Sequence, residues 1–142
     1  GVSVDRTDEL KEDIKLISDG KIVAVGEVKG INRGVARAHI NQADSHRERS
    51  GFDPNLPCLL IVNTGIKSAH SLSDKNQDID GEQVKHAANM NVLVLRTLDI
   101  LGLLKLVLAG KVERVHALKL LTTSNGWLRV DGENIQVLQQ IN

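Results

Sequence analysis

Aromatic side chains are nearly absent from this 142-residue chain: Phe52 and Trp127 are the only two, and there is no tyrosine. A core must therefore be built from leucine, valine, isoleucine and alanine. Proteins that bind single-stranded nucleic acid on OB or RRM surfaces stack bases on exposed aromatic rings. The lack of such rings argues against a binding surface of that kind.

Cysteine is also scarce, with Cys58 as the single one. This excludes an intrachain disulfide and a cysteine-rich zinc cluster. Cys58 begins an apolar run to Val62, where we expect it to be a small buried side chain. No apolar stretch approaches the roughly 20 residues of a membrane-spanning helix, and no signal peptide is visible. We therefore predict a cytoplasmic protein with no membrane partner.

Net charge is absent as well, because 18 basic residues balance 18 acidic ones. Nucleic-acid-binding proteins usually carry a basic excess. The charges are nevertheless uneven along the chain, with acids concentrated in residues 1–19 and bases in residues 29–49. This pattern fits a metal site beside a path for phosphates, and it equally fits two solvated faces of opposite charge.

The length fits one domain spanning residues 1–142, and the hydrophobic pattern predicts an α/β fold with a mixed sheet. The first two strands should be joined by an Asp-Gly turn at residues 18–20. Later, short apolar runs alternate with helical patterns, which implies parallel strands joined by crossovers. The expected strands are 14–17, 21–29, 58–62 and 92–95, and the expected helices are 35–49, 81–90 and 98–109, with a polar loop at 65–80.

The C-terminal part of the chain, residues 115–142, is predicted to form a small β appendix. Asp80 and Thr97 are expected to cap the two helices that precede it, and Asp99 to serve in the first turn of the second helix. Asn-Gly and Asp-Gly turns separate the strands of the appendix. These strands are expected at 115–122, 127–130 and 135–138.

The strand over 21–29 ends with two charges, Glu27 and Lys29, after a run of apolar residues. Alternation puts both side chains on the face of Val25, at the edge of a buried core. Burying a charge there is costly unless it is compensated. A divalent cation bound by Glu27 and a second acid would compensate it, and magnesium prefers carboxylate oxygens. Lys29 would then lie beside the attacking water and the scissile phosphate.

The second acid should come from the preceding strand, where the register decides between two residues. If the hairpin loop has three residues, Asp13 lies opposite Val25 and shares the face of Glu27. If the loop has two residues, Asp13 lies opposite Gly26 on the other face, and Glu12 faces Glu27. The sequence leaves both registers open. It also leaves open that the two charges at the end of the next strand form a simple surface ion pair.

The acidic strand end, the turn and the charged strand together resemble the motif of the PD-(D/E)XK nuclease superfamily, which includes many restriction endonucleases and Holliday-junction resolvases. In that superfamily an aspartate on one strand precedes a Glu-x-Lys on the next. The resemblance implies that Asp13 and Glu27 bind Mg²⁺ or Mn²⁺ and that Lys29 is catalytic. A glutamine on the following helix is frequent in some branches, and Gln42 occupies that place as a supporting active-site residue. The matching residues are Glu12-Asp13-Ile14 and Val25-Gly26-Glu27-Val28-Lys29-Gly30.

The resemblance extends over residues 10–110, most of the chain. The run 57–64 resembles the fourth strand of some uncharacterised nuclease-like domains, and residues 92–101 resemble the strand and Thr-x-Asp segment that follow it there. The implied fold is a restriction-endonuclease-like mixed β-sheet flanked by helices. Members of the superfamily normally have a helix before the first strand, and this chain starts too late for it. A C-terminal fragment of a longer protein would have that appearance.

The resemblance implies a magnesium-dependent hydrolase, an endonuclease-like enzyme that cleaves phosphodiester bonds of nucleic acid, with DNA as the expected substrate. Many members of the superfamily dimerise, so a homodimer is an expected state. One alternative is a non-enzymatic nucleic-acid-binding or dimerisation module that keeps the fold. Another is a small-ligand α/β domain in which Glu27 and Lys29 form a structural ion pair. The arginines expected to contact the nucleic-acid backbone are Arg33, Arg37 and Arg47.

The five histidines of the chain do not form a recognisable metal-ligand spacing. His39 and His46 are seven residues apart on one polar helix face, together with Gln42 and Arg49, which is too far for a zinc-binding pair on a helix. We therefore expect helix-surface or phosphate-contact roles for these two histidines.

Overall fold

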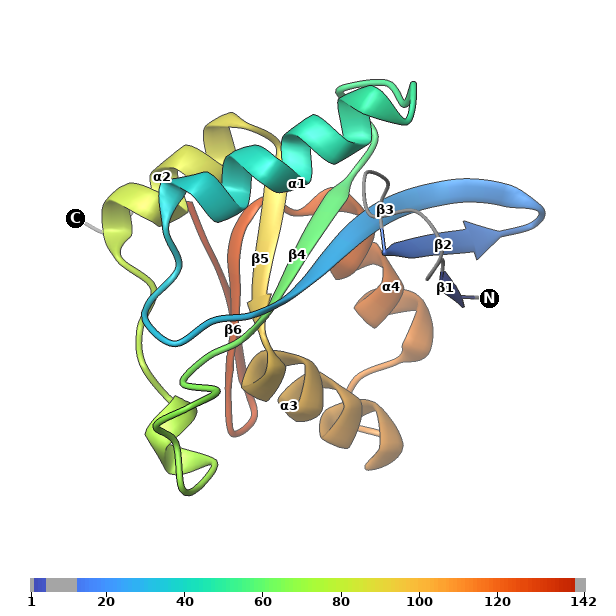
Figure 1. The fold of residues 1–142 in the computed structure, drawn as a ribbon. Helices are drawn as coiled ribbons and strands as arrows, with labels where there is room; N and C mark the ends of the chain where they lie inside the picture. The colour runs from blue at the N-terminus through green and yellow to red at the C-terminus, as the bar shows by residue number, and fades with distance from the viewer. Residues whose placement is uncertain (1, 5–12, 140–142) are drawn as a thin grey trace.

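The computed structural model describes residues 2–4 and 13–139, which form one mixed β-sheet between two layers of helices (Figure 1). The predicted α/β class and mixed sheet are confirmed. The strands are β1 (Val2–Val4), β2 (Ile14–Ser18), β3 (Lys21–Gly30), β4 (Cys58–Asn63), β5 (Val92–Arg96), β6 (Gly126–Asp131) and β7 (Asn134–Leu138). The helices are α1 (Arg37–Arg49), α2 (Gly81–Asn89), α3 (Thr97–Leu108) and α4 (Arg114–Thr123), with a short 3-10 helix, η1 (Ser73–Lys75).

The seven strands lie side by side in the order of the sequence. Strands β1, β2 and β3 pair antiparallel, β3 to β6 pair in parallel, and β7 returns antiparallel to β6. Parallel neighbours need crossover connections, which α1, α2 and the α3–α4 pair provide. The C-terminal ends of β3, β4 and β5 consequently meet at one edge of the sheet.

Two apolar cores lie on opposite faces of the sheet. One contains Val25 and Cys58 of the sheet together with Ile40 of α1. The other contains Leu59 of the sheet together with Leu103 of α3. Helices α1 and α2 therefore cover one face, and α3 and α4 cover the other. The predicted burial of Cys58 is confirmed.

The C-terminal part of the chain is not a separate β appendix. Residues 115–122, predicted as a strand, belong to helix α4, and β6 pairs in parallel with β5 and so extends the main sheet. The β-branched residues at both ends of this segment favour a strand locally. However, the residues that pack against the second core, Ala117, Leu120 and Leu121, have the i, i+3, i+4 spacing of a helix. Packing on the sheet therefore overrides the local preference.

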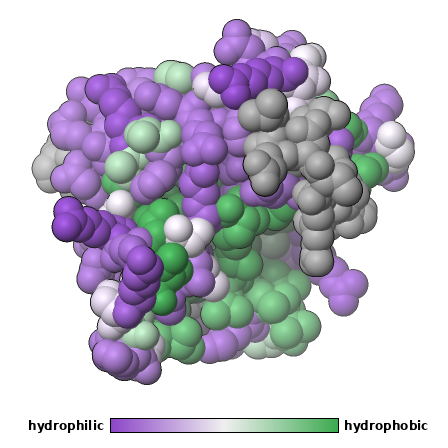
Figure 2. Space-filling view, viewed as in Figure 1, coloured by the Kyte–Doolittle hydropathy of each residue, from purple (hydrophilic) through white to green (hydrophobic). Residues whose placement is uncertain are grey.

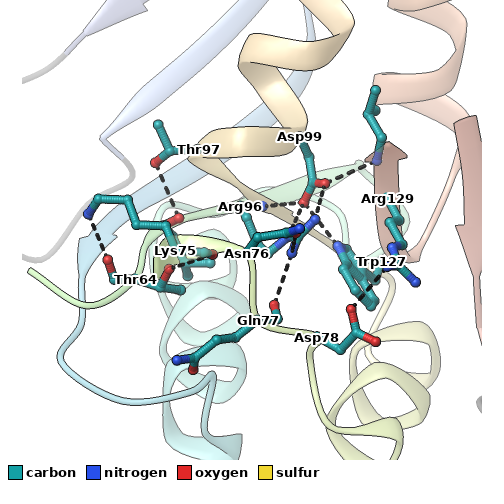
Figure 3. Close-up of polar contacts among 12 residues, drawn as sticks. Thr64, Lys75, Asn76, Gln77, Asp78, Arg96, Thr97, Asp99, Trp127 and Arg129 are labelled. Carbon is teal, nitrogen blue, oxygen red and sulfur yellow. Dashed lines mark hydrogen bonds and ion pairs between the residues drawn. The ribbon is translucent and has the colours of Figure 1, made fainter. Parts of the chain in front are cut away.

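Asp99 is completely buried at the start of α3 and joins that helix to β6 (Figure 3). Its carboxylate accepts hydrogen bonds from Arg96 N at 2.9 Å and Arg96 Nη2 at 2.8 Å. It also accepts from Trp127 Nε1 and from Val130 N, both at 3.0 Å. The Arg96 guanidinium lies over the Trp127 ring, with Cζ 4.8 Å from the ring centroid. This buried cluster ties the ends of β5 and β6 to α3.

The two predicted helix caps have different outcomes. The Asp80 carboxylate caps α2 by accepting a hydrogen bond from Glu82 N at 3.0 Å, as predicted. Thr97 does not cap α3, because its hydroxyl donates to the Val62 carbonyl oxygen at 3.3 Å. The carboxylate of Asp99 binds the first N–H of that helix end instead, since an acid in the third helical position can reach back to it.

The surface is strongly polar over α1 and α2, and it is more apolar in the lower half of the view (Figure 2). The exposed apolar side chains include Val28 of β3 and Leu101 and Leu104 of α3. Val28 points away from α1, whereas its neighbours on either side of it in β3 point toward that helix. In the part of the chain that the structure describes, no helix is long and apolar enough to cross a membrane.

Candidate active site

The β2–β3 hairpin has a two-residue turn formed by Asp19 and Gly20, which have φ angles of 50° and 75°. Positive φ angles at both central residues are those of a type I′ turn, whose twist suits a hairpin. A two-residue turn by itself would place Asp13 opposite Gly26, on the face away from Glu27. A change of register farther along the hairpin prevents that outcome.

A β-bulge at Val23 shifts the register of the hairpin by one residue. Beyond the bulge, Ile14 pairs with Gly26. The next position in this register sets Asp13 beside Glu27, on the same face of the sheet. Neither predicted alternative was correct: the turn is short, but the bulge restores a shared face for the two acids.

The shifted register places large side chains of β2 beside small residues of β3. Leu16 pairs with Ala24, and Ile14 pairs with Gly26. A Cβ added to Gly26 would lie 3.2 Å from Leu59 Cβ, which is tighter than ordinary contact. The bulge thus suits close packing of the hairpin on the α3 side of the sheet. Its consequence on the opposite, α1 side is the meeting of the two acids.

Asp13 is held by the backbone of β3. Its Oδ2 accepts a hydrogen bond from Val28 N at 2.8 Å. Its carboxylate is also close enough to Glu27 to raise the pKa of that group, by its charge and by a hydrogen bond. The structure therefore brings Asp13 and Glu27 together, whereas Glu12, the other predicted candidate, lies outside the described residues.

Glu27 is a buried carboxyl group, with only 4% of its surface exposed. Its burial raises its pKa, and the neighbouring Asp13 raises it further, while His46 acts in the opposite direction. The His46 contact joins Nδ1 of the ring to Glu27 Oε1. The ionised Glu27 carboxylate therefore has two costs, its burial away from water and the repulsion from Asp13. A bound cation would relieve both costs.

Lys29 is half-buried near the end of β3, two residues after Glu27 and on the same face. Its Nζ donates a hydrogen bond to Gln42 Oε1 of α1 at 2.7 Å. His39 lies one turn earlier on α1, and its pKa is lowered by burial and by the charge of Lys29. His39 Nδ1 accepts a hydrogen bond from Ala36 N at 3.0 Å, so the neutral ring carries its proton on Nε2.

The polar face of α1 is turned toward the two charged residues of β3. Gln42 contacts Lys29, and His46, one turn later on α1, contacts Glu27. Sequence reasoning placed His46 on the helix surface or on a phosphate, but it is only 5% exposed. His46 could have been identified from its position four residues after Gln42. The two residues share one face of the helix, and the motif expects that face to point toward the site.

The three arginines predicted to contact nucleic acid have different environments. Arg33 and Arg37 are exposed, and Arg37 Nη2 lies 3.0 Å from His86 Nδ1. Arg47 is buried, with 2% of its surface exposed. It cannot reach a phosphate, so its predicted role is corrected to a structural one. Its two terminal nitrogens donate to the carbonyl oxygens of Leu56, Met90 and Asn91 and to the carboxylate of Asp44.

The acidic pair suits a hard divalent cation. Within residues 2–4 and 13–139, no three or more histidine, cysteine or acidic side chains are grouped as a metal site. Asp13 and Glu27 supply two carboxylates, and Mg²⁺ is commonly bound by one or two carboxylates while it keeps several waters. The donor set and the unfavourable pairing of two acids therefore fit a cation that is only partly coordinated by protein.

Comparison with protein-family models, with curated proteins and with solved structures gives no match to this chain. The function is therefore inferred from the geometry of Asp13, Glu27 and Lys29. These three side chains are oriented by Val28 N, His46 and Gln42, respectively.

Proposed function

We propose that this protein is a divalent-metal-dependent nuclease of the PD-(D/E)XK type, which hydrolyses phosphodiester bonds in nucleic acid, with DNA as the substrate. One observation carries the proposal: the carboxylates of Asp13 and Glu27 lie close together on one face of a hairpin, and Lys29 follows Glu27 on the same face of β3. The seven-stranded mixed sheet with helices on both faces supports a restriction-endonuclease-like fold, which forms part of the proposal.

Asp13 and Glu27 would hold Mg²⁺ or Mn²⁺. Each carboxylate is anchored to the protein through one oxygen, Oδ2 in Asp13 and Oε1 in Glu27. The second oxygen of each is then the one suited to the cation. When bound, such a cation polarises a phosphoryl oxygen and favours ionisation of water. The protein contributes a fixed position for the cation on the α1 side of the hairpin.

Lys29 would stabilise the negative charge that develops on the phosphate. Its position on the face of Glu27 would bring the ammonium group toward the cation site, and Gln42 restricts where Nζ can point. In the reaction, the water oxygen forms a bond to phosphorus while the bond from phosphorus to the leaving oxygen breaks. The water gives up one proton, and the leaving oxygen takes one up.

The nucleic-acid backbone would approach past the start of α1. Arg33 and Arg37 are exposed there, and the first turn of α1 contains no acidic residue. The N-terminus of a helix attracts phosphate, because its free N–H groups carry partial positive charge. His39 can add a neutral Nε2–H donor on the same side.

The second candidate is a nucleic-acid-binding or dimerisation module that keeps the site without cleaving. The balance of 18 basic and 18 acidic residues favours it, since tight binding to a phosphate backbone usually needs a basic excess. The two candidates differ in whether the acidic pair takes up a metal and whether Lys29 is needed for product formation.

A Mn²⁺ titration by calorimetry, followed by cleavage assays on supercoiled and linear DNA, tests the proposal. Asp13→Ala and Glu27→Ala should each abolish Mn²⁺ uptake and cleavage. Lys29→Ala should keep Mn²⁺ binding and lose cleavage by two or more orders of magnitude, the size found for removing a charge-stabilising donor (about 100- to 1,000-fold). Glu48→Ala, an exposed acid on α1, is the control and should behave as wild type.

Two results would contradict the proposal. Wild-type protein that is folded and takes up no Mn²⁺ would remove the metal site. If wild type and Lys29→Ala take up Mn²⁺ equally well and neither cleaves DNA or RNA, the binding module is favoured.

A further inference from the structure

We infer that His46 is the positioning residue of this site: its Nδ1–H holds Oε1 of Glu27, so that Oε2 is kept for the cation shared with Asp13. The inference rests on the proposed function and adds a residue that the motif does not include. It gives His46 no contact with substrate or metal, and its effect passes entirely through Glu27.

Burial makes the contact between His46 and Glu27 difficult for water to replace. The two residues are 5% and 4% exposed, respectively. A buried carboxylate without a hydrogen-bond donor is costly, and water has little access to replace the imidazole as that donor. The imidazole therefore fixes the orientation of Glu27.

The position of the imidazole is itself fixed by the next residue on α1. The Arg47 guanidinium donates to the carbonyl oxygen of Leu56, in the loop before β4, and to those of Met90 and Asn91, directly after α2. Ile40 and Ala43 of the same helix pack in the first core. The helix therefore cannot slide or rotate easily, and His46 stays aimed at β3.

The same arrangement recurs for the other two motif residues. Asp13 Oδ2 is held by Val28 N at 2.8 Å, and Lys29 Nζ is held by Gln42 at 2.7 Å. His46 does for Glu27 what these groups do for the other two. Partners that hydrogen-bond a metal-ligating side chain typically change metal affinity by about 10- to 100-fold when removed. His46 is therefore expected to act on metal affinity and not only on folding.

Substitutions at position 46 can distinguish the effect of the hydrogen-bond donor from the effect of side-chain volume. In His46→Asn, the side-chain amide places an N–H close to where Nδ1 lies in histidine. His46→Gln carries the same amide one methylene farther out, and His46→Leu keeps comparable volume without a donor. His116→Leu, an exposed histidine on α4, is the matched control.

The experiment is a Mn²⁺ titration of these four variants and wild type, with thermal unfolding in EDTA to establish that each is folded. His46→Asn should bind Mn²⁺ within a few-fold of wild type, and His46→Gln and His46→Leu should bind about 10- to 100-fold more weakly. His116→Leu should not differ. Electron spin-echo spectra of bound Mn²⁺ should lack modulation from an imidazole nitrogen, because His46 touches only Glu27.

Equal Mn²⁺ affinity in His46→Asn and His46→Gln would overturn the inference, since the position of the donor would then make no difference. This comparison stands even if His46→Leu does not fold. Imidazole nitrogen modulation that disappears in His46→Asn would also overturn it, by making His46 a ligand. A wild type that binds no Mn²⁺ removes the proposed function as a whole, whereas loss of binding in Glu27→Ala without any effect at position 46 removes the role of His46 alone.

Discussion

Two buried carboxylates lie near the ends of strands on either side of β4, and their surroundings are opposite. Asp99, after β5, is surrounded by donors: Arg96 binds it with its backbone and guanidinium, and Trp127 and Val130 add two more N–H groups (Figure 3). Glu27, near the end of β3, has one imidazole contact and a second carboxylate as its neighbour. One acid is fully compensated, and the other is compensated only in part.

The difference separates a structural acid from a candidate ligand. A buried charge that is fully paired and hydrogen-bonded holds elements together and has no capacity left for a ligand. A buried acid beside a like charge costs stability in the free protein, and sites of this kind are where function is most often found. By this criterion the end of β3 is the candidate site, and the equally polar end of β5 is part of the scaffold.

The largest expected effect is on the compensated acid. Asp99→Asn should lower the free energy of unfolding by about 3–5 kcal/mol, because it leaves the guanidinium of Arg96 buried without a counter-charge. Urea denaturation measures this change. Asp131→Asn, an exposed acid at the end of β6, is the control and should stay within about 0.5 kcal/mol of wild type. An Asp99→Asn variant as stable as wild type would contradict the structural role of Asp99, because neither acid would then be essential to the fold.

The next effect is a pH dependence that arises from Glu27. The folded-state pKa of Glu27 is raised above its ordinary value of 4.5, so the folded form binds the proton more tightly than the unfolded form. The contribution of Glu27 to the free energy of unfolding of metal-free protein should therefore fall as pH rises from 4.5 through the raised pKa. Glu27→Gln lacks this dependence and should be neutral or stabilising at pH 7, by about 1 kcal/mol.

Thermal unfolding of wild type and Glu27→Gln in EDTA across this pH range measures the effect as the difference between the two proteins. The difference should shrink as the solution becomes more acidic and Glu27 is protonated. A difference that does not vary with pH would mean that Glu27 is as well compensated as Asp99.

The smallest expected effect on stability is at Gln42, whose side chain is exposed. Gln42→Ala should change the free energy of unfolding by less than about 1 kcal/mol, as for a single solvent-accessible hydrogen bond. Mn²⁺ affinity should be unchanged, because Gln42 contacts Lys29 and neither acid. DNA cleavage should fall about tenfold, the equivalent of about 1.4 kcal/mol in the barrier. Cleavage at the wild-type rate would show that Lys29 needs no partner.

Much of the local structure could be predicted from the sequence. The Asp19-Gly20 turn, the buried strand from Cys58, and helices α1, α2 and α3 follow from turn chemistry and hydrophobic spacing that act within a few residues. The segment 115–122 was predicted wrongly for the same reason. Its β-branched ends favour a strand, and only the surface it packs on favours a helix.

The candidate site was predictable in its residue types but not in its assembly. The motif pointed to Asp13, Glu27, Lys29 and Gln42, and the structure places these side chains together. It did not point to His46, and Arg47 was wrongly predicted to contact the nucleic-acid backbone. Burial of these two depends on how α1 docks onto the sheet, which helical periodicity cannot give for a helix with so thin an apolar stripe.

By itself, the sequence determined the position of the hairpin turn, the alternation of Glu27 and Lys29 on one face of β3, and the supply of polar side chains on α1, because each of these depends on neighbouring residues alone. Only the tertiary structure decided that Asp13 meets Glu27. That meeting requires the bulge at Val23, and the bulge suits the packing of Ile14 and Gly26 against Leu59, a residue more than thirty positions away. Register and burial are set by contacts between distant segments, so no local pattern contains them.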